Sequence, residues 1–338
     1  MIKSSLKFMG VLILTTVLAT LLTACGGSDG GDGGIGAAIE PDAQLTTNNS
    51  PQVASAVTKS INLTEIGDLL GGIGDISALS ASHKLENKGY LYKVLSKLIT
   101  IPKTQIISDG QLSVKGSIPS TTEACSGGGT VIMSATWTGS DIPQDASQIS
   151  DLEATLTFSS CKEGTATING TASFTFAGTL DNPTGFTFSS LNFTFADSST
   201  GDNITMTNFS LVITSPDLTG STIMLSGAIS GIADNLSIID VYENLTIDHR
   251  YTQNGDMFTL SGRMRPVCLD GWITINTSID IFVPANADCP SAGEIIITSA
   301  GDNISVVMES DSTISIYFNG TLVQTYGDCT ELEGLCSS

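Results

Sequence analysis

Residues 152–158 read Leu-Glu-Ala-Thr-Leu-Thr-Phe, so apolar side chains alternate with polar ones. A period of two is typical of a β-strand that buries one face and exposes the other. From Gln111 onward the alternation recurs, at Ala166, Ile168, Ala172, Phe174 and Phe176, at Ile273, Ile275, Ile279, Ile281 and Val283, and at Ile314, Ile316 and Phe318. The chain therefore contains a series of strands, each with one apolar face.

Turn sequences separate these strands. Asp-Asn pairs begin at Asp202, Asp234 and Asp302, and Asn-Gly pairs, which favour tight hairpins, begin at Asn169 and Asn319. Asn169-Gly170 lies inside an alternating run, so a bulge explains it equally well. The connections are short and show almost no helical pattern, which favours antiparallel pairing of neighbouring strands.

The alternation changes phase once within a single aromatic stretch. Phe186 and Phe188 share one parity, whereas Leu191, Phe193 and Phe195 share the other. This predicts either a bulge near Ser189-Ser190 or a turn.

Together these patterns predict a mainly β fold, a large antiparallel meander over residues 111–338. The polar side of the strands is mostly Thr, Ser and Asn, which predicts a solvated face. A solvated face favours an open curved sheet or a barrel-like sheet over a sandwich that is buried on both sides.

Residues 46–110 predict a mixed helical segment that packs on the sheet. Asn48-Asn49-Ser50-Pro51 is typical of a helix start, and the buried stripe would consist of Val53, Ala54, Val57 and Ile61. Residues 66–79 are apolar but rich in glycine, which disfavours a long helix. Residues 90–99 predict an amphipathic helix with Lys93 and Lys97 on one side. It would pack on the sheet or lie on a membrane surface.

The N-terminus has the features of an export signal. Lys3 and Lys7 precede about 15 mostly apolar residues, which is short for a membrane-spanning helix of about 20. The next residues, Leu22-Thr23-Ala24-Cys25, resemble the lipobox of bacterial lipoproteins. This resemblance implies that residues 1–24 are removed and that Cys25 is acylated, with palmitate among its acyl chains.

The predicted anchor gives a location. Residues 25–45 would form the lipidated cysteine and a flexible glycine-rich linker. Gly26 follows the cysteine where an aspartate would favour retention in the inner membrane, so we expect an outer-membrane protein of the bacterial envelope. An ordinary secreted protein with a free Cys25 is the alternative.

The other six cysteines form an even set in an exported chain: Cys125, Cys161, Cys268, Cys289, Cys329 and Cys336. They predict a disulfide framework, for which 15 pairings exist. The simplest is sequential pairing, in which Cys125 joins Cys161, Cys268 joins Cys289 and Cys329 joins Cys336. No Cys-x-x-Cys or Cys/His spacing indicates a metal site.

The charge and the motifs exclude several functions. The chain carries 13 Lys+Arg against 34 Asp+Glu, and a net charge of −21 excludes nucleic acid as a partner. His83 and His249 are the two histidines, and we expect His249 to be a partly exposed strand residue. The glycine-rich run at Cys125 lacks the helix of a phosphate-binding loop and predicts a disulfide-linked turn. We therefore expect no enzyme and no cofactor.

Several short segments resemble a group of uncharacterised proteobacterial lipoproteins: Cys125–Thr130, Leu156–Cys161, Ile168–Thr171, Cys289–Ile297 and Asn48–Ala54. The resemblance implies export, a lipid anchor and a β-rich body. It implies no activity and assigns no functional residue.

The expected function is that of a lipid-anchored envelope protein of a non-catalytic, structural or partner-binding type. Its anchor would hold it to the membrane, and its polar face could meet a protein or a polysaccharide. Calcium bridging at the Asp-Asn turns is an extension of this hypothesis. The alternative is a periplasmic carrier that holds a lipid or another apolar ligand in the curved sheet.

Overall fold

The computed structural model describes residues 41–59, 116–139, 148–179, 182–215, 219–233, 236–285, 287, 289–332 and 335–336. The chain divides into two units, Met1–Ile39 and Glu40–Ser338, and the described residues all belong to the second. No helix within those ranges has the length and hydropathy needed to cross a bilayer.

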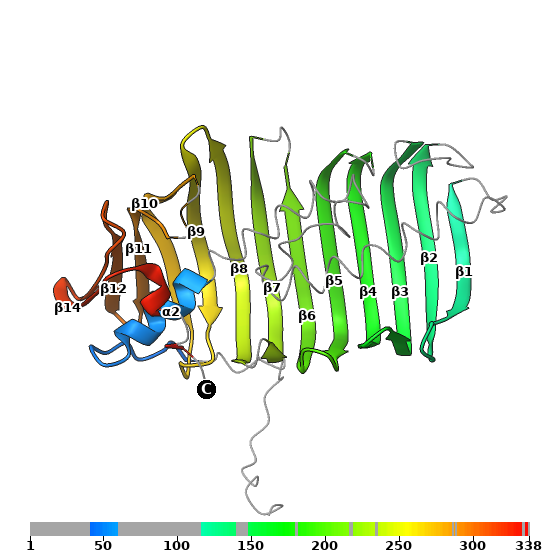
Figure 1. Ribbon diagram of the computed structural model, residues 1–338, viewed down its shortest axis with the longest axis horizontal. Coiled ribbons are helices and arrows are strands. Elements are labelled where there is room, and N and C mark those ends of the chain that lie inside the picture. The colour runs from blue at the N-terminus through cyan, green and yellow to red at the C-terminus, as the bar shows by residue number, and fades with distance from the viewer. Residues whose placement is uncertain are drawn as a thin grey trace, which may run out of the picture. The chain divides into compact units, whose positions relative to one another are not determined.

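The second unit is built on one antiparallel sheet of 14 strands, which lie across the sheet in chain order (Figure 1). The strands are β1 (Ser117–Ala124), β2 (Thr130–Gly139), β3 (Ile149–Glu163), β4 (Ala166–Thr179), β5 (Asn182–Asp197), β6 (Asp202–Thr214), β7 (Gly220–Ala233), β8 (Leu236–Thr252), β9 (Gly255–Arg265), β10 (Ile273–Pro284), β11 (Ala292–Ser299), β12 (Asp302–Met308), β13 (Ile314–Phe318) and β14 (Thr321–Tyr326). A helix, α2 (Ser50–Lys59), and a 3-10 turn, η4 (Cys329–Leu332), accompany them. The predicted open antiparallel meander is confirmed.

The two faces of the sheet follow the alternation of the sequence. In β3, Leu152, Leu156 and Phe158 are buried, whereas Thr155 and Thr157 between them are half-buried. We call the side that carries the apolar residues the core face and the opposite side the outer face. The chain therefore forms a sheet with one apolar side and one hydroxyl-rich side, as its period of two predicts.

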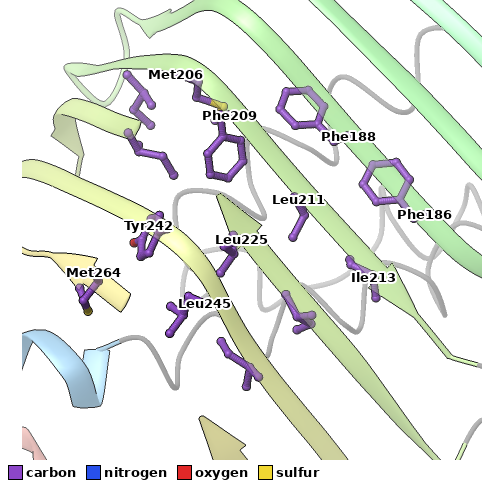
Figure 2. Packing of buried hydrophobic residues seen from close by; sticks show 14 of the residues in the cluster. Phe186, Phe188, Met206, Phe209, Leu211, Ile213, Leu225, Tyr242, Leu245 and Met264 are labelled. Atoms are coloured by element: carbon purple, nitrogen blue, oxygen red, sulfur yellow. The ribbon is translucent and has the colours of Figure 1, made fainter. Parts of the chain in front are cut away.

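Phenylalanines form the centre of the core face. The largest fully buried side chains are Phe174, Phe176, Phe186, Phe188, Phe193 and Phe209. The ring centroids of Phe174 and Phe188 lie 5.4 Å apart and those of Phe176 and Phe186 lie 5.1 Å apart. Figure 2 shows Phe186, Phe188 and Phe209 among the aliphatic side chains of the neighbouring strands. Such ring pairs stabilise a core by about 0.5–1.5 kcal/mol each beyond the area that they bury.

The phase change in the aromatic stretch is a bulge within one strand. The pairing of β4 with β5 shifts between Gly170 and Ala172, where Gly170 pairs with Phe193. Leu191 is 68% exposed, whereas Phe193 is fully buried. The predicted bulge is confirmed, but its predicted position placed Leu191 on the wrong face, because the one extra residue of β5 comes after Ser190.

Gly170 takes part in the same irregularity, so Asn169-Gly170 marks a bulge and not a hairpin. Its φ of +99° is in the region that favours glycine, and a Cβ there would lie 2.0 Å from the carbonyl oxygen of Asn192. The other Asn-Gly pair forms the predicted hairpin between β13 and β14, with φ of 48° at Asn319 and 78° at Gly320.

A second bulge corrects the prediction for β10. Ile273, Ile275 and Ile281 are buried, but Ile279 is 58% exposed. The register shifts on both sides of Ile279 in the pairing with β11. Ile279 therefore does not line the core face with the other isoleucines.

The N-terminal segment packs at the C-terminal end of the sheet. The predicted helix is confirmed as α2, in which Val53, Ala54 and Val57 are buried. The helix contacts β12, β13 and η4, and the Ser55 hydroxyl donates to the Leu332 carbonyl oxygen at 2.5 Å. The predicted residue Ile61 and the stretches at 66–79 and 90–99 lie outside the described residues.

All six cysteines predicted to form disulfides do so, in the pairs Cys125–Cys161, Cys268–Cys336 and Cys289–Cys329. The sequential pairing is right for the first pair and wrong for the other two. The reason is that the chain after β14 returns to both connections of β10: Cys329 meets Cys289 in the β10–β11 connection, and Cys336 meets Cys268 in the β9–β10 connection. Closing loops of 36 to 68 residues contributes about 4 kcal/mol each in the chain-entropy description.

Two substitutions on β5 test the assignment of its faces. We expect Phe188→Ala to lower the free energy of unfolding by about 3–5 kcal/mol, because it leaves a cavity in the centre of the core face. Leu191→Ala on the same strand should change it by no more than about 0.5 kcal/mol. Urea denaturation of both variants measures these values, and a large loss for Leu191→Ala would contradict the position of the bulge.

Candidate functional site

The outer face of β2–β7 carries an unbroken row of hydroxyl side chains. Strand pairing places six of them opposite one another in turn: Ser134, Thr155, Ser173, Ser189, Ser210 and Ser226. Since neighbouring strands lie about 4.8 Å apart, the row extends over roughly 24 Å. Thr155 and Ser173 form a hydrogen bond between their hydroxyl oxygens, which lie 3.3 Å apart.

A second row lies beside the first, two residues along each strand. Its members are Thr136, Glu153, Thr175, Thr187, Val212 and Met224. On the other side of the first row, Thr157 and Thr171 form a further hydroxyl pair at 3.1 Å. We call the two rows and this pair the hydroxyl face. It presents donors and acceptors at regular spacing, because each hydroxyl has one proton to donate and two lone pairs.

The hydroxyl face is accessible to solvent. Ser189, Thr136 and Thr175 are exposed, and Thr155 and Ser173 are half-buried by their own neighbours. Among the members of the two rows, Glu153 is the one ionisable residue. The face is therefore nearly neutral, although the chain as a whole has a net charge of −21.

The neutral surface ends at β8, where charged pairs begin. Arg250 on β8 bonds Asp280 on β10 at 2.5 Å, and Arg263 on β9 bonds Glu243 on β8 at 2.6 Å. The Arg263 guanidinium also lies 5.1 Å from the centre of the Trp272 ring, within the range of a cation–π contact. The outer face thus has a neutral part on β2–β7 and a charged part on β8–β11.

Hydrogen bonds hold one carboxylate of the charged part in its ionised form. Glu294 on β11 accepts from the Ser278 hydroxyl at 2.7 Å and from the Ser305 hydroxyl at 2.6 Å. These bonds lower the pKa of Glu294, Ser278 contributing most. The arrangement joins β10, β11 and β12 on the solvent side of the sheet.

Asp240 on β8 is an acid in the opposite situation. Burial raises its pKa, and the opposing effects of the Lys59 charge and of hydrogen bonds from Tyr242 and Val267 are smaller. The Tyr242 hydroxyl lies 3.4 Å from the Asp240 carboxylate. The positive charge of Lys59, at the end of α2, attracts this carboxylate. The attraction between Lys59 and Asp240 therefore links the helix to the sheet.

His249 is not the partly exposed residue that the alternation predicted. Its side chain is 5% exposed. The ring stacks on Phe258 at 4.5 Å and lies 4.2 Å from Tyr251, and its Nε2 is 3.6 Å from the Asp256 carboxylate. His249 is therefore a buried residue of the core face. His83 and Cys25 lie outside the described residues.

The glycine-rich run at Cys125 forms the predicted disulfide-linked turn. Cys125, Cys161 and Glu163 are the one group of potential metal ligands within the described ranges, but both sulfur atoms are committed to the disulfide. The Glu163 carboxylate accepts from the backbone N–H of Ser126 at 2.9 Å and from its hydroxyl at 2.7 Å. Glu163 therefore holds the turn.

The Asp-Asn pairs lie directly after turns and begin strands. Asp202 is the first residue of β6 and Asp302 the first of β12; Asp234-Asn235 lies outside the described residues. Asp302 accepts from the Asn319 side chain at 2.8 Å, and Asn319 accepts from the Asn303 N–H at 2.9 Å. These bonds give the carboxylate a structural role, and calcium bridging stays a prediction.

Comparison with known proteins adds no relative, since no family model, curated protein or solved structure matches the chain. The sequence indicated a polar face of Thr, Ser and Asn, but it did not reveal the row from Ser134 to Ser226. That row depends on the register between strands, and bulges at β5 and β10 set registers that alternation alone does not specify.

Asp240→Asn tests the buried acid. A raised pKa in the folded state means that ionisation of Asp240 costs stability as pH rises above the ordinary value of about 3.9. We therefore expect Asp240→Asn to gain stability relative to the wild type between acidic and neutral pH. Urea denaturation across this range measures the difference.

Asp311→Asn is the matched control, with the opposite sign. Hydrogen bonds from Thr313 lower the pKa of Asp311, so ionised Asp311 favours the folded state above its unfolded pKa. This variant should lose stability relative to the wild type as pH rises. A parallel change in both variants would contradict the assignment for Asp240.

Proposed function

We propose that the protein is an exported, lipid-anchored protein of the bacterial envelope without catalytic activity, and that it binds a neutral polysaccharide through the hydroxyl face. The observation that carries the proposal is the solvent-facing row of six hydroxyl residues across β2–β7. The row is continuous over six strands, and it presents hydroxyl groups, as the proposed polysaccharide ligand does.

Export is supported by the cysteines. The described chain joins six of them in three disulfides, which persist in oxidising compartments and are rare in the cytosol. The lipobox resemblance at Leu22-Thr23-Ala24-Cys25 supports acylation of Cys25, and Gly26 favours the outer membrane. Under this proposal the membrane is reached through the acyl chains alone.

A non-catalytic role is supported by the composition of the hydroxyl face. General acid–base catalysis needs a positioned acid or base, and glycoside hydrolysis commonly needs two carboxylates. Glu153 lies between Thr136 and Thr175 in its row, with no second ionisable residue among the row's members. The face can bind through many weak hydrogen bonds but offers no pair of groups that would cleave a bond.

A polysaccharide fits the face better than a protein partner does. Protein interfaces depend on buried Trp, Tyr and Arg side chains, and the two rows contain none of these residues. A neutral sugar polymer offers hydroxyl groups along its length, which can exchange hydrogen bonds with successive strands. The near absence of charge in this region also means that a neutral polymer can replace the surface water without leaving a charge unpaired.

The core face is the surface that a second function would use, that of a carrier for a lipid or another apolar ligand. Apolar side chains line this face over β3–β8, including Phe188, Leu211 and Ile247. Among the described helices, α2 contacts β12 and β13 and η4 contacts β14. These side chains are fully buried within the chain, so the carrier hypothesis requires an apolar ligand to displace part of the chain from β3–β8.

Mass spectrometry tests the anchor and separates the two functions. We expect the mature protein to begin at Cys25 with acyl chains attached, and Cys25→Ala to remove the acylation and the membrane association. Under the polysaccharide proposal, native spectra of the purified protein show no additional lipid. A stoichiometric bound lipid that remains in Cys25→Ala would instead support the carrier.

Ser189→Arg tests the hydroxyl face. This residue is exposed in the centre of the row, so a long charged side chain should reduce the retention of the protein on insoluble neutral polysaccharides at least tenfold. Ser261→Arg makes the same change at an exposed serine on β9, outside the hydroxyl face, and should bind like the wild type. Equal binding by the two variants would contradict the proposed site.

A further inference from the structure

The two edges of the sheet differ in how they resist a new strand. β1 contains Pro119 and Glu123, and its pairing with β2 shifts between Ile118 and Thr121. Proline and charge are features by which proteins protect an edge from pairing with another chain, and β1 has both, whereas an irregular register is common to β1 and β14. The β1 edge is therefore protected.

The β14 edge lacks proline and charge. Its sequence is Thr-Leu-Val-Gln-Thr-Tyr, which combines residues of high β-propensity. Leu322 is 54% exposed, and Thr321, Gln324 and Thr325 are also exposed. Among the described strands β14 is terminal in the sheet order, with β13 as its one neighbour. Its second side thus presents backbone N–H and C=O groups that another strand can bind.

We propose that β14 pairs with β14 of a second copy of this chain, antiparallel and about a two-fold axis, so that the two sheets become continuous. A two-fold contact uses the same surface on both copies, and antiparallel pairing of a strand with itself meets this condition. The pairing occupies the β14 edge of both copies, so it ends at a dimer.

Charge favours this edge. The chain has a net charge of −21, so most contacts between two copies bring acids together, whereas the six residues of β14 carry no charge. Asp328 follows the strand closely. Antiparallel pairing places it beside the Asn319-Gly320 turn of the second copy, where the Asn319 amide bonds Asp302, whereas parallel pairing would place it beside the second copy's own Asp328.

The pairing is expected to be weak. Two six-residue strands bury less than the roughly 1,200 Å² of a stable interface, and a register shift between Ile316 and Tyr317 interrupts the regular pairing of β14. Anchoring on a membrane can raise the effective concentration to about the millimolar range. The fraction of the protein that is dimeric in the cell therefore rests on the proposed lipid anchor, whereas the ability of β14 to pair does not.

Leu322→Lys tests the edge by giving it the charge that protects natural edge strands. The background is the full chain with Cys25→Ala, in which no acyl chain can drive association. We expect sedimentation analysis from micromolar to millimolar concentration to show a monomer–dimer equilibrium. Leu322→Lys should weaken the dimer at least tenfold. Leu191→Lys makes the same change at an exposed leucine on the internal strand β5 and should leave the equilibrium unchanged.

Hydrogen exchange locates the contact independently of the variants. Under the proposal, protection of the β14 amides rises with protein concentration, whereas that of the β1 amides does not. A monomer at every concentration, or a dimer that both lysine variants weaken equally, would overturn the proposal. Because these measurements use a chain without acylation, a failed anchor and a failed strand pairing give separate results.

Discussion

Every strand of the sheet depends on one constraint, which is that apolar side chains must reach the same face. Since side chains alternate along a strand, a slip of one residue would expose a whole apolar row. Phe188 and Phe193 are both buried although they are an odd number of residues apart. They can lie on the same face because β5 contains a bulge between them. The bulges are therefore part of the mechanism that keeps the core face continuous.

The C-terminal end of the sheet is fastened by contacts between distant parts of the chain. Ala43 donates to the Trp272 carbonyl oxygen at 2.9 Å, and Trp272 donates to the Pro41 carbonyl oxygen at 3.1 Å. Ser55 reaches Leu332, and two disulfides join the last residues of the chain to the connections on either side of β10. Such contacts close long loops at an entropic cost, and the disulfides offset it by restricting the unfolded chain.

The sequence predicted the fold class well because the period of two is a local signal that survives in every strand. It predicted the helix at α2 and the Asn319-Gly320 hairpin because each has a local sequence signal of its own. It predicted the set of paired cysteines because their number is even. It failed at Leu191, Ile279 and His249, and at two of the disulfides. Those features depend on the register between strands and on which distant segments of the chain meet. The spacing of residues along one strand specifies neither of these. The hydroxyl row could not be predicted from the sequence for the same reason.

The division of the outer face follows from how each part of the sheet meets water. Within β2–β7, Thr and Ser satisfy the solvent side with hydroxyls that also bond across strands, as Thr157 does with Thr171. From β8 onward, charged side chains pair across the strands instead, as Arg250 does with Asp280. Exposed ion pairs contribute little to stability, so the packing of the core face holds both parts together. The difference between them therefore affects recognition more than folding: neutral hydroxyls can exchange their water for another neutral polar surface without leaving a charge unpaired.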